Sequence, residues 1–195
     1  RSLKQHFFEK PVGMVNYALD LRLHRRDRGV SEMSAALKRR FNFEVVPPIN
    51  DIEREKTLVR TRAVATLERV GQAFPVDEYV LEALVTTFRD LRNGRTVEGW
   101  AVEKPTTVMS TAECVSVATS IGLQSAYFGA DRDAASMLPG YLLGVVLKDD
   151  AQDRGRLLAY WDSAVKRRAE TGARLWKRLY ELRRVLEDDD GQTRG

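Results

Sequence analysis

Cysteine and histidine are scarce in this 195-residue sequence, which contains one cysteine, Cys114, and two histidines. A single cysteine excludes an intrachain disulfide, and so few sulfur and imidazole groups argue against a structural zinc site. No apolar run approaches the roughly 20 residues of a membrane-spanning helix, and the first residues lack a signal-peptide core. We therefore predict a cytoplasmic protein without a metal site or membrane contact.

Motifs for binding nucleotide phosphates are also missing. The sequence contains no G-x-x-x-x-G-K-S/T loop and no strand that ends in paired acidic residues. Such a loop cradles the phosphates through its backbone amides, and the acidic residues help to hold magnesium. We therefore expect that the chain alone neither binds nor hydrolyses ATP. It begins with Arg1 and not with Met, which suggests a fragment of a longer protein.

Charge of one sign does not dominate, because 32 basic and 28 acidic residues are interspersed and give a net charge of +4. Mixed charge of this kind is typical of solvated helix surfaces. The segment from Arg22 to Arg28 is the one locally basic run, and together with Arg39 and Arg40 it offers a weak case for nucleic-acid binding. Nucleic-acid binding is therefore the least favoured function for this sequence, behind the two that are given below.

Helical signals fill the middle of the chain. Asn50 and Glu53 have the spacing of a capping box, and so do Ser110 and Glu113. Asn93-Gly94 is typical of a helix end, and prolines should stop or kink neighbouring helices. The apolar periodicity predicts helices over about 50–74, ending at Pro75, then 76–92, 110–128 and 134–147, the last kinked or delayed by Pro139.

The C-terminal part has the most regular pattern. Its apolar residues recur in alternating steps of three and four, as in one long helix: Leu158, Trp161, Val165, Leu175, Leu179, Leu182 and Leu186. Arg168 and Gly172 interrupt the stripe and predict a weaker middle between two packing zones. We expect the last four leucines to be buried against the protein or a partner, and the residues after Leu186 to fray.

The segment that most strongly suggests a catalytic role is residues 26–43, RDRGVSEMSAALKRRFNF. Ser31 to Phe41 predicts a short helix, and 41–48 a short strand. An arginine between them, anchored by Phe41, could project from the domain edge and stabilise charge on a γ-phosphate, as an arginine finger does. From spacing alone, the commoner explanation is that Lys38, Arg39 and Arg40 favour the negative end of a helix dipole.

The pieces ALKRRF and NFEVVPP, followed by helices from Asp51 onward, resemble the MoxR-type branch of the AAA+ ATPases over roughly residues 27–168. The resemblance implies that Arg40, which precedes Phe41, is an arginine finger acting in trans, with Arg39 as the alternative. It also implies ATP and Mg²⁺ in the full-length parent, a homo-oligomeric ring, and client proteins that include von Willebrand A domains.

Two positions depart from that family. The third lid helix commonly begins with a sensor 2 arginine, whereas this sequence has Thr111, Ala112 and Glu113. Upstream of Asp27, no apolar strand ends in a sensor 1 asparagine. Glu113 is more simply a capping carboxylate, and Cys114 a small buried hydrophobe.

We predict a mainly α fold: a C-terminal remnant of an AAA+ α/β core (1–48), a helical lid (49–150), and a long C-terminal helix with its tail (151–195). The predicted function is to supply the arginine finger and the lid of an ATPase that remodels client proteins. The alternative is a non-catalytic helical module whose C-terminal stripe binds another protein.

Overall fold

The computed structural model describes residues 49–128, 133–148 and 150–187. The chain divides into two units at Pro48, and all of these residues belong to the second unit. The predicted helix over 31–41, the strand over 41–48, the basic run Arg22 to Arg28, and Arg39 and Arg40 lie outside the described residues. The mainly helical fold is confirmed for the described part, whose only β-type pairing is an isolated bridge between Arg95 and Ala101.

Four helices form the first part of this unit: α4 (Ile52–Arg69), α5 (Glu78–Asn93), α6 (Thr111–Phe128) and α7 (Ala134–Val146). The α4 cap is Asp51, one residue after the predicted Asn50, and its carboxylate accepts a hydrogen bond from Glu53 N at 2.9 Å. Gly94, at φ 69°, ends α5 as predicted. Helix α7 starts at Ala134 and continues through Pro139.

Helix α4 is shorter than predicted. It ends at Arg69, because Gly71 adopts φ 71° and turns the chain well before Pro75. Val70, directly after the helix end, is 51% exposed, and Phe74 further along the turn is half-buried against the core. A Cβ on Gly122 would lie 3.0 Å from the Leu67 side chain and 3.1 Å from Phe74. Gly122 therefore allows α6 to lie close to α4.

The C-terminal segment is not the single long helix that the leucine stripe predicts. It contains α8 (Asp153–Tyr160), a π-helical turn η1 (Trp161–Val165), α9 (Lys166–Glu170), α10 (Arg174–Glu181) and the 3-10 turn η2 (Arg183–Leu186). Gly172, at φ 96°, breaks the helix between α9 and α10. Helix α10 then packs back on α9 and η1, where Trp161 Nε1 donates to Leu179 O at 2.9 Å.

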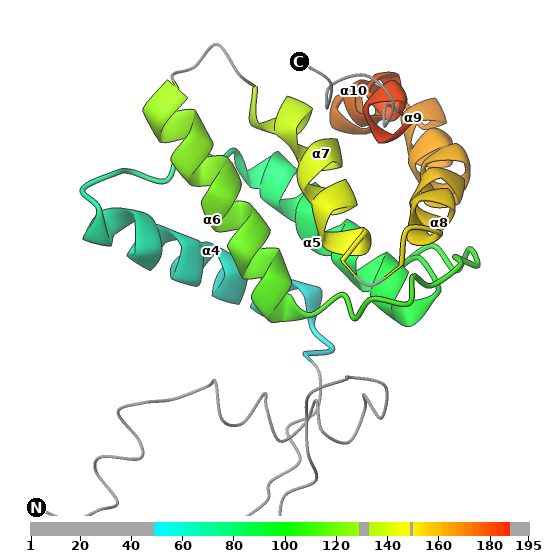
Figure 1. Ribbon diagram of the computed structural model, residues 1–195, viewed down its shortest axis with the longest axis horizontal. Coiled ribbons are helices and arrows are strands. Elements are labelled where there is room, and N and C mark those ends of the chain that lie inside the picture. The colour runs from blue at the N-terminus through cyan, green and yellow to red at the C-terminus, as the bar shows by residue number, and fades with distance from the viewer. Residues whose placement is uncertain (1–48, 129–132, 149, 188–195) are drawn as a thin grey trace, which may run out of the picture. The chain divides into compact units, whose positions relative to one another are not determined.

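The predicted burial of the leucine stripe is confirmed at two of its four last positions. Leu179 and Leu186 are fully buried, whereas Leu175 and Leu182 are half-buried. In Figure 1, α8, α9 and α10 form a group on one side of the unit, and α4 and α6 lie together on the other. Helix α5 contacts both groups, so its residues link them.

Candidate functional site

The first candidate site surrounds Glu55, a fully buried carboxylate near the start of α4. Three side chains donate hydrogen bonds to it. Arg89 Nη1 lies 2.9 Å from Glu55 Oε2, Arg92 Nη2 lies 2.8 Å from Oε1, and the Thr111 hydroxyl lies 2.7 Å from Oε1. These donors come from α5 and from the first residue of α6, so one carboxylate joins three helices.

This environment keeps Glu55 ionised. Burial by itself would raise the pKa of Glu55, but hydrogen bonds from Thr111 and Arg92, the charge of Arg92, and the hydrogen bond from Arg89 together hold its pKa below the ordinary value. A buried carboxylate needs such partners, because an unpaired buried charge costs several kcal/mol. Arg89 and Arg92 are themselves largely buried, with 13% and 19% of their side chains exposed.

Arg89 also holds the segment that leads into α4. Its Nη1 donates to the carbonyl of Ile49 at 3.0 Å, and its Nη2 to that of Asn50 at 2.6 Å. Glu55 in turn fixes the guanidinium of Arg89. The lead-in segment, residues 49–50, is therefore tied to the side of α5 and cannot turn freely at the first residue of the helix.

The start of α6 is organised as the sequence predicts. Glu113 Oε2 accepts from Ser110 N at 3.0 Å, and Ser110 Oγ accepts from Glu113 N at 3.2 Å, which completes the capping box. Lys148 Nζ donates to the other Glu113 oxygen at 2.7 Å. The guanidinium at this helix start comes from α5, where Arg92 Nη1 donates to the Thr111 hydroxyl at 3.2 Å.

A second buried cluster surrounds Arg168 of α9, which is 4% exposed. Its Nη1 lies 2.8 Å from Asp90 Oδ2 and 2.9 Å from the Tyr160 hydroxyl. Its Nε and Nη2 donate to the two oxygens of Glu98, at 2.8 and 2.7 Å. The guanidinium also lies over the ring of Trp176, 4.7 Å from its centroid. Arg168 therefore joins α5, the turn after it, α8 and α10.

The two carboxylates of the second cluster differ in their electrostatics. Hydrogen bonds from Arg168 lower the pKa of Glu98 to about 2. Burial raises the pKa of Asp90, and the charge and hydrogen bonds of Arg168 and Tyr160 only partly offset that effect. The neighbouring Arg167 lies over Trp100, 5.2 Å from the ring centroid, so consecutive arginines hold the turn between Gly94 and Ala101.

Neither Glu55 nor Arg168, the residues at the centres of the two clusters, was predicted as a site residue from the sequence. Glu55 precedes Val59, Ala63 and Leu67 at four-residue steps, so it lies on the buried face of α4. That spacing was a usable signal, because a carboxylate on an apolar helix face needs buried partners. Arg168 likewise occupies the leucine stripe, where the pattern predicts only a weaker middle of the C-terminal helix.

Other predicted features of the site can also be placed. Cys114 is fully buried, as predicted, and burial raises the pKa of its thiol well above the ordinary value. The described ranges contain no group of three or more His, Cys, Asp and Glu side chains able to hold a metal ion. A search of the same ranges found no helix long and apolar enough to cross a membrane.

Comparison with known protein families identifies the class of this helical domain as the C-terminal domain of an AAA+ ATPase. The chain belongs to the family described as the YehL-like AAA+ ATPase C-terminal domain, whose model matches residues 53–187. It is 40% identical over 162 residues to a protein of Escherichia coli (strain K12) named "Uncharacterized protein YehL". The aligned part makes up 83% of this chain and 43% of that relative, so the chain spans less than half of the relative's length. No solved structure matches the chain.

Proposed function

We propose that this chain is the finger-and-lid part of an AAA+ ATPase that uses ATP and Mg²⁺ in a homo-oligomeric ring to remodel client proteins. Membership of the YehL-like AAA+ C-terminal family supports the ATPase class. The finer assignment to the MoxR type, the ring and clients with von Willebrand A domains rest on the resemblance of residues 26–43 and the helices that follow. The cytoplasmic location also stays a prediction.

The lid function is supported mainly by the hydrogen bonds that Arg89 donates to the backbone carbonyls of Ile49 and Asn50. A lid reports nucleotide state by changing its angle to the domain that precedes it. For a change in that angle to reach all the helices of the lid, its first residues must move together with those helices as one rigid body. Glu55 provides this, because it binds Arg89 and also Arg92 and Thr111.

Arg40 is the proposed arginine finger, and Arg39 is the alternative. A guanidinium supplied to a neighbouring site would stabilise charge on the transferred phosphoryl group, and Lys could not reproduce its planar, bidentate donors. The chain then needs no phosphate-binding loop of its own for this role. The loop and the magnesium ligands would come from the part of the parent that precedes this chain.

The test uses the full-length parent. Arg40→Ala should lower ATPase turnover by about 10³-fold or more while nucleotide affinity stays nearly unchanged. Mixing this variant with a phosphate-loop variant should restore activity, because each subunit supplies what its neighbour lacks. Arg39→Ala is the matched control. Full activity of Arg40→Ala would remove the role from that residue, and loss in Arg39→Ala alone would transfer it there.

A further inference from the structure

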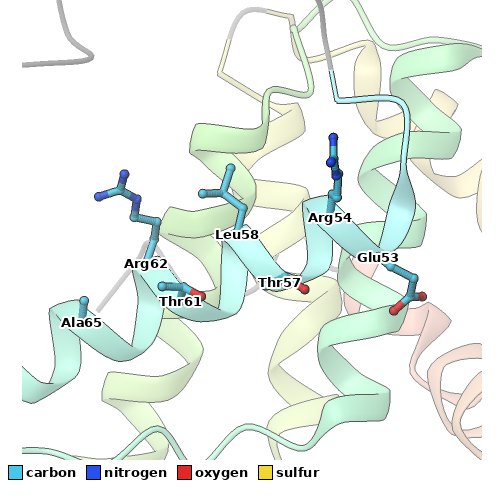
Figure 2. Close-up of a pocket in the computed structure, with 7 residues that line it drawn as sticks. All are labelled: Glu53, Arg54, Thr57, Leu58, Thr61, Arg62 and Ala65. Atoms are coloured by element: carbon cyan, nitrogen blue, oxygen red, sulfur yellow. The ribbon is translucent and has the colours of Figure 1, made fainter.

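Helix α4 has a second face that the Glu55 cluster does not use. The helix buries Glu55, Val59, Ala63 and Leu67, and it packs mainly against α6. Its other side carries a shallow groove lined by Glu53, Arg54, Thr57, Leu58, Thr61, Arg62 and Ala65. Figure 2 shows Arg54, Leu58 and Arg62 projecting from α4 in the same direction.

This face is positively charged. Arg54, Arg62 and Arg69 form no ion pair with any carboxylate in the described part of the chain. The other cations of α4 differ, since Lys56 and Arg60 pair with acidic residues of α4 and α5. The one carboxylate that lines the groove, Glu53, is bound by Lys56 at 3.0 Å. Three guanidiniums along one face therefore have no carboxylate partner among the residues that the structure describes, which suits them to an anionic partner.

The spacing of the residues indicates the shape of that partner. Leu58 and Ala65 are seven residues apart, and so are Arg62 and Arg69, so each pair repeats after about 10.5 Å along the helix. Leu58 and Ala65 therefore form a single seven-residue step of apolar surface flanked by arginines, on which about two turns of a second helix can rest. Thr57 and Thr61 are short, so they leave room for close approach of a second backbone.

We propose that the α4 stripe, which consists of Arg54, Leu58, Arg62, Ala65 and Arg69, docks an acidic amphipathic helix of a partner protein. The partner helix presents carboxylates at seven-residue intervals to the arginines and a row of apolar side chains to Leu58 and Ala65. A nucleic-acid strand fits less well, because its charges recur every 3.4 Å or so and it offers no apolar ridge. This docking goes beyond the ATPase function and does not depend on nucleotide.

The probe is a synthetic helical peptide with glutamates seven residues apart beside a row of leucines, and its binding to the whole chain is measured by fluorescence anisotropy. Arg62→Glu combined with Arg69→Glu should weaken binding by about tenfold or more, because like charges then face each other. The same peptide with lysines in place of the glutamates should bind this variant and not the natural chain. Circular dichroism confirms that the variant is folded.

The matched control is Arg174→Glu combined with Lys177→Glu, which makes the same charge change on the exposed side of α10. It should leave peptide affinity within about twofold, because charges beyond a Debye length are screened. Equal weakening by both pairs would overturn the proposal, and so would absence of peptide binding to the natural chain. Tighter binding of a single-stranded DNA oligonucleotide, lost in the α4 variant, would assign this face to nucleic acid instead.

Discussion

The two buried ionic clusters are built from adjacent residues of α5 but have opposite composition. Around Glu55, one carboxylate is shared by two guanidiniums, from Arg89 and Arg92. Around Arg168, one guanidinium is shared by two carboxylates, from Asp90 and Glu98. Glu55 is fully buried and both of its arginines lie nearer to solvent. Around Arg168, Glu98 is partly exposed, but Asp90 is as deeply buried as the arginine itself.

This difference determines how much stability each cluster loses when its central residue is substituted. A partly exposed arginine that loses its carboxylate can recruit water, whereas Asp90, at 1% exposure, cannot. Asp90 is already the strained member, because burial raises its pKa despite Arg168. Loss of the central residue should therefore cost more in the Arg168 cluster than in the Glu55 cluster.

The largest effect is expected for Arg168→Ala, which leaves Asp90 and Tyr160 buried without their cation. The free energy of unfolding should fall by about 3–5 kcal/mol. Urea unfolding followed by circular dichroism measures it. Arg168→Lys, which keeps the charge but loses the bidentate bonds to Glu98, serves as the control and should lose less. A loss below about 1 kcal/mol in the alanine variant would contradict the ranking.

Glu55→Ala should have the next largest effect, a loss of about 2–3 kcal/mol in unfolding free energy. The loss is smaller than for Arg168→Ala because Arg89 and Arg92, freed from the carboxylate, can be hydrated. The lead-in segment should also loosen, since Arg89 loses the carboxylate that fixes it. Hydrogen exchange at the start of α4 would detect this as faster exchange than in Arg168→Ala. If Glu55→Ala proves costlier than Arg168→Ala, the comparison of the two clusters is wrong.

Glu55 and Asp90 should respond to pH in opposite ways, whereas Glu98, whose pKa is lowered to about 2, should respond as Glu55 does. The pKa of Glu55 is lower in the folded chain, so its contribution to stability is present above the ordinary glutamate pKa and is lost as the pH falls through the folded value. The pKa of Asp90 is raised, so protonation relieves it as the pH falls. Unfolding free energies from pH 6 to 3 should decline less steeply in Glu55→Gln than in the natural chain. Parallel curves would show that Glu55 does not dominate the acid response.

The smallest effect is expected for Thr111→Val, which removes the hydroxyl that donates to Glu55 and accepts from Arg92 Nη1, and leaves both arginines in place. The loss should be about 1–2 kcal/mol, because each hydrogen bond usually contributes about 1 kcal/mol to a protein's stability. Ser116→Ala on the exposed side of α6 provides a control and should be nearly neutral. A Thr111→Val loss as large as that of Glu55→Ala would mean that the hydroxyl, and not the ion pairs, holds the cluster together.

The sequence predicts the helices well because their apolar periodicity and caps are local. Ser110 and Glu113, three residues apart, specify the start of α6, and Gly94 specifies the end of α5. Breaks at Gly71 and Gly172 were harder, because a glycine in a helical pattern is tolerated unless tertiary contacts favour the turn. The ionic clusters were not predicted. Glu55 and Arg89 are 34 positions apart and Arg168 and Glu98 are 70 apart, so only packing brings the residues of each pair together.

The solitary thiol of Cys114 has a practical consequence. It is fully buried at the start of α6, and its raised pKa keeps it protonated at neutral pH. Maleimide reagents should therefore leave the native chain unlabelled and modify it only when α6 separates from α4 and α5. The rate of labelling therefore reports how often that opening occurs. A cysteine introduced on the surface can also be labelled with a fluorophore without competing reaction at Cys114.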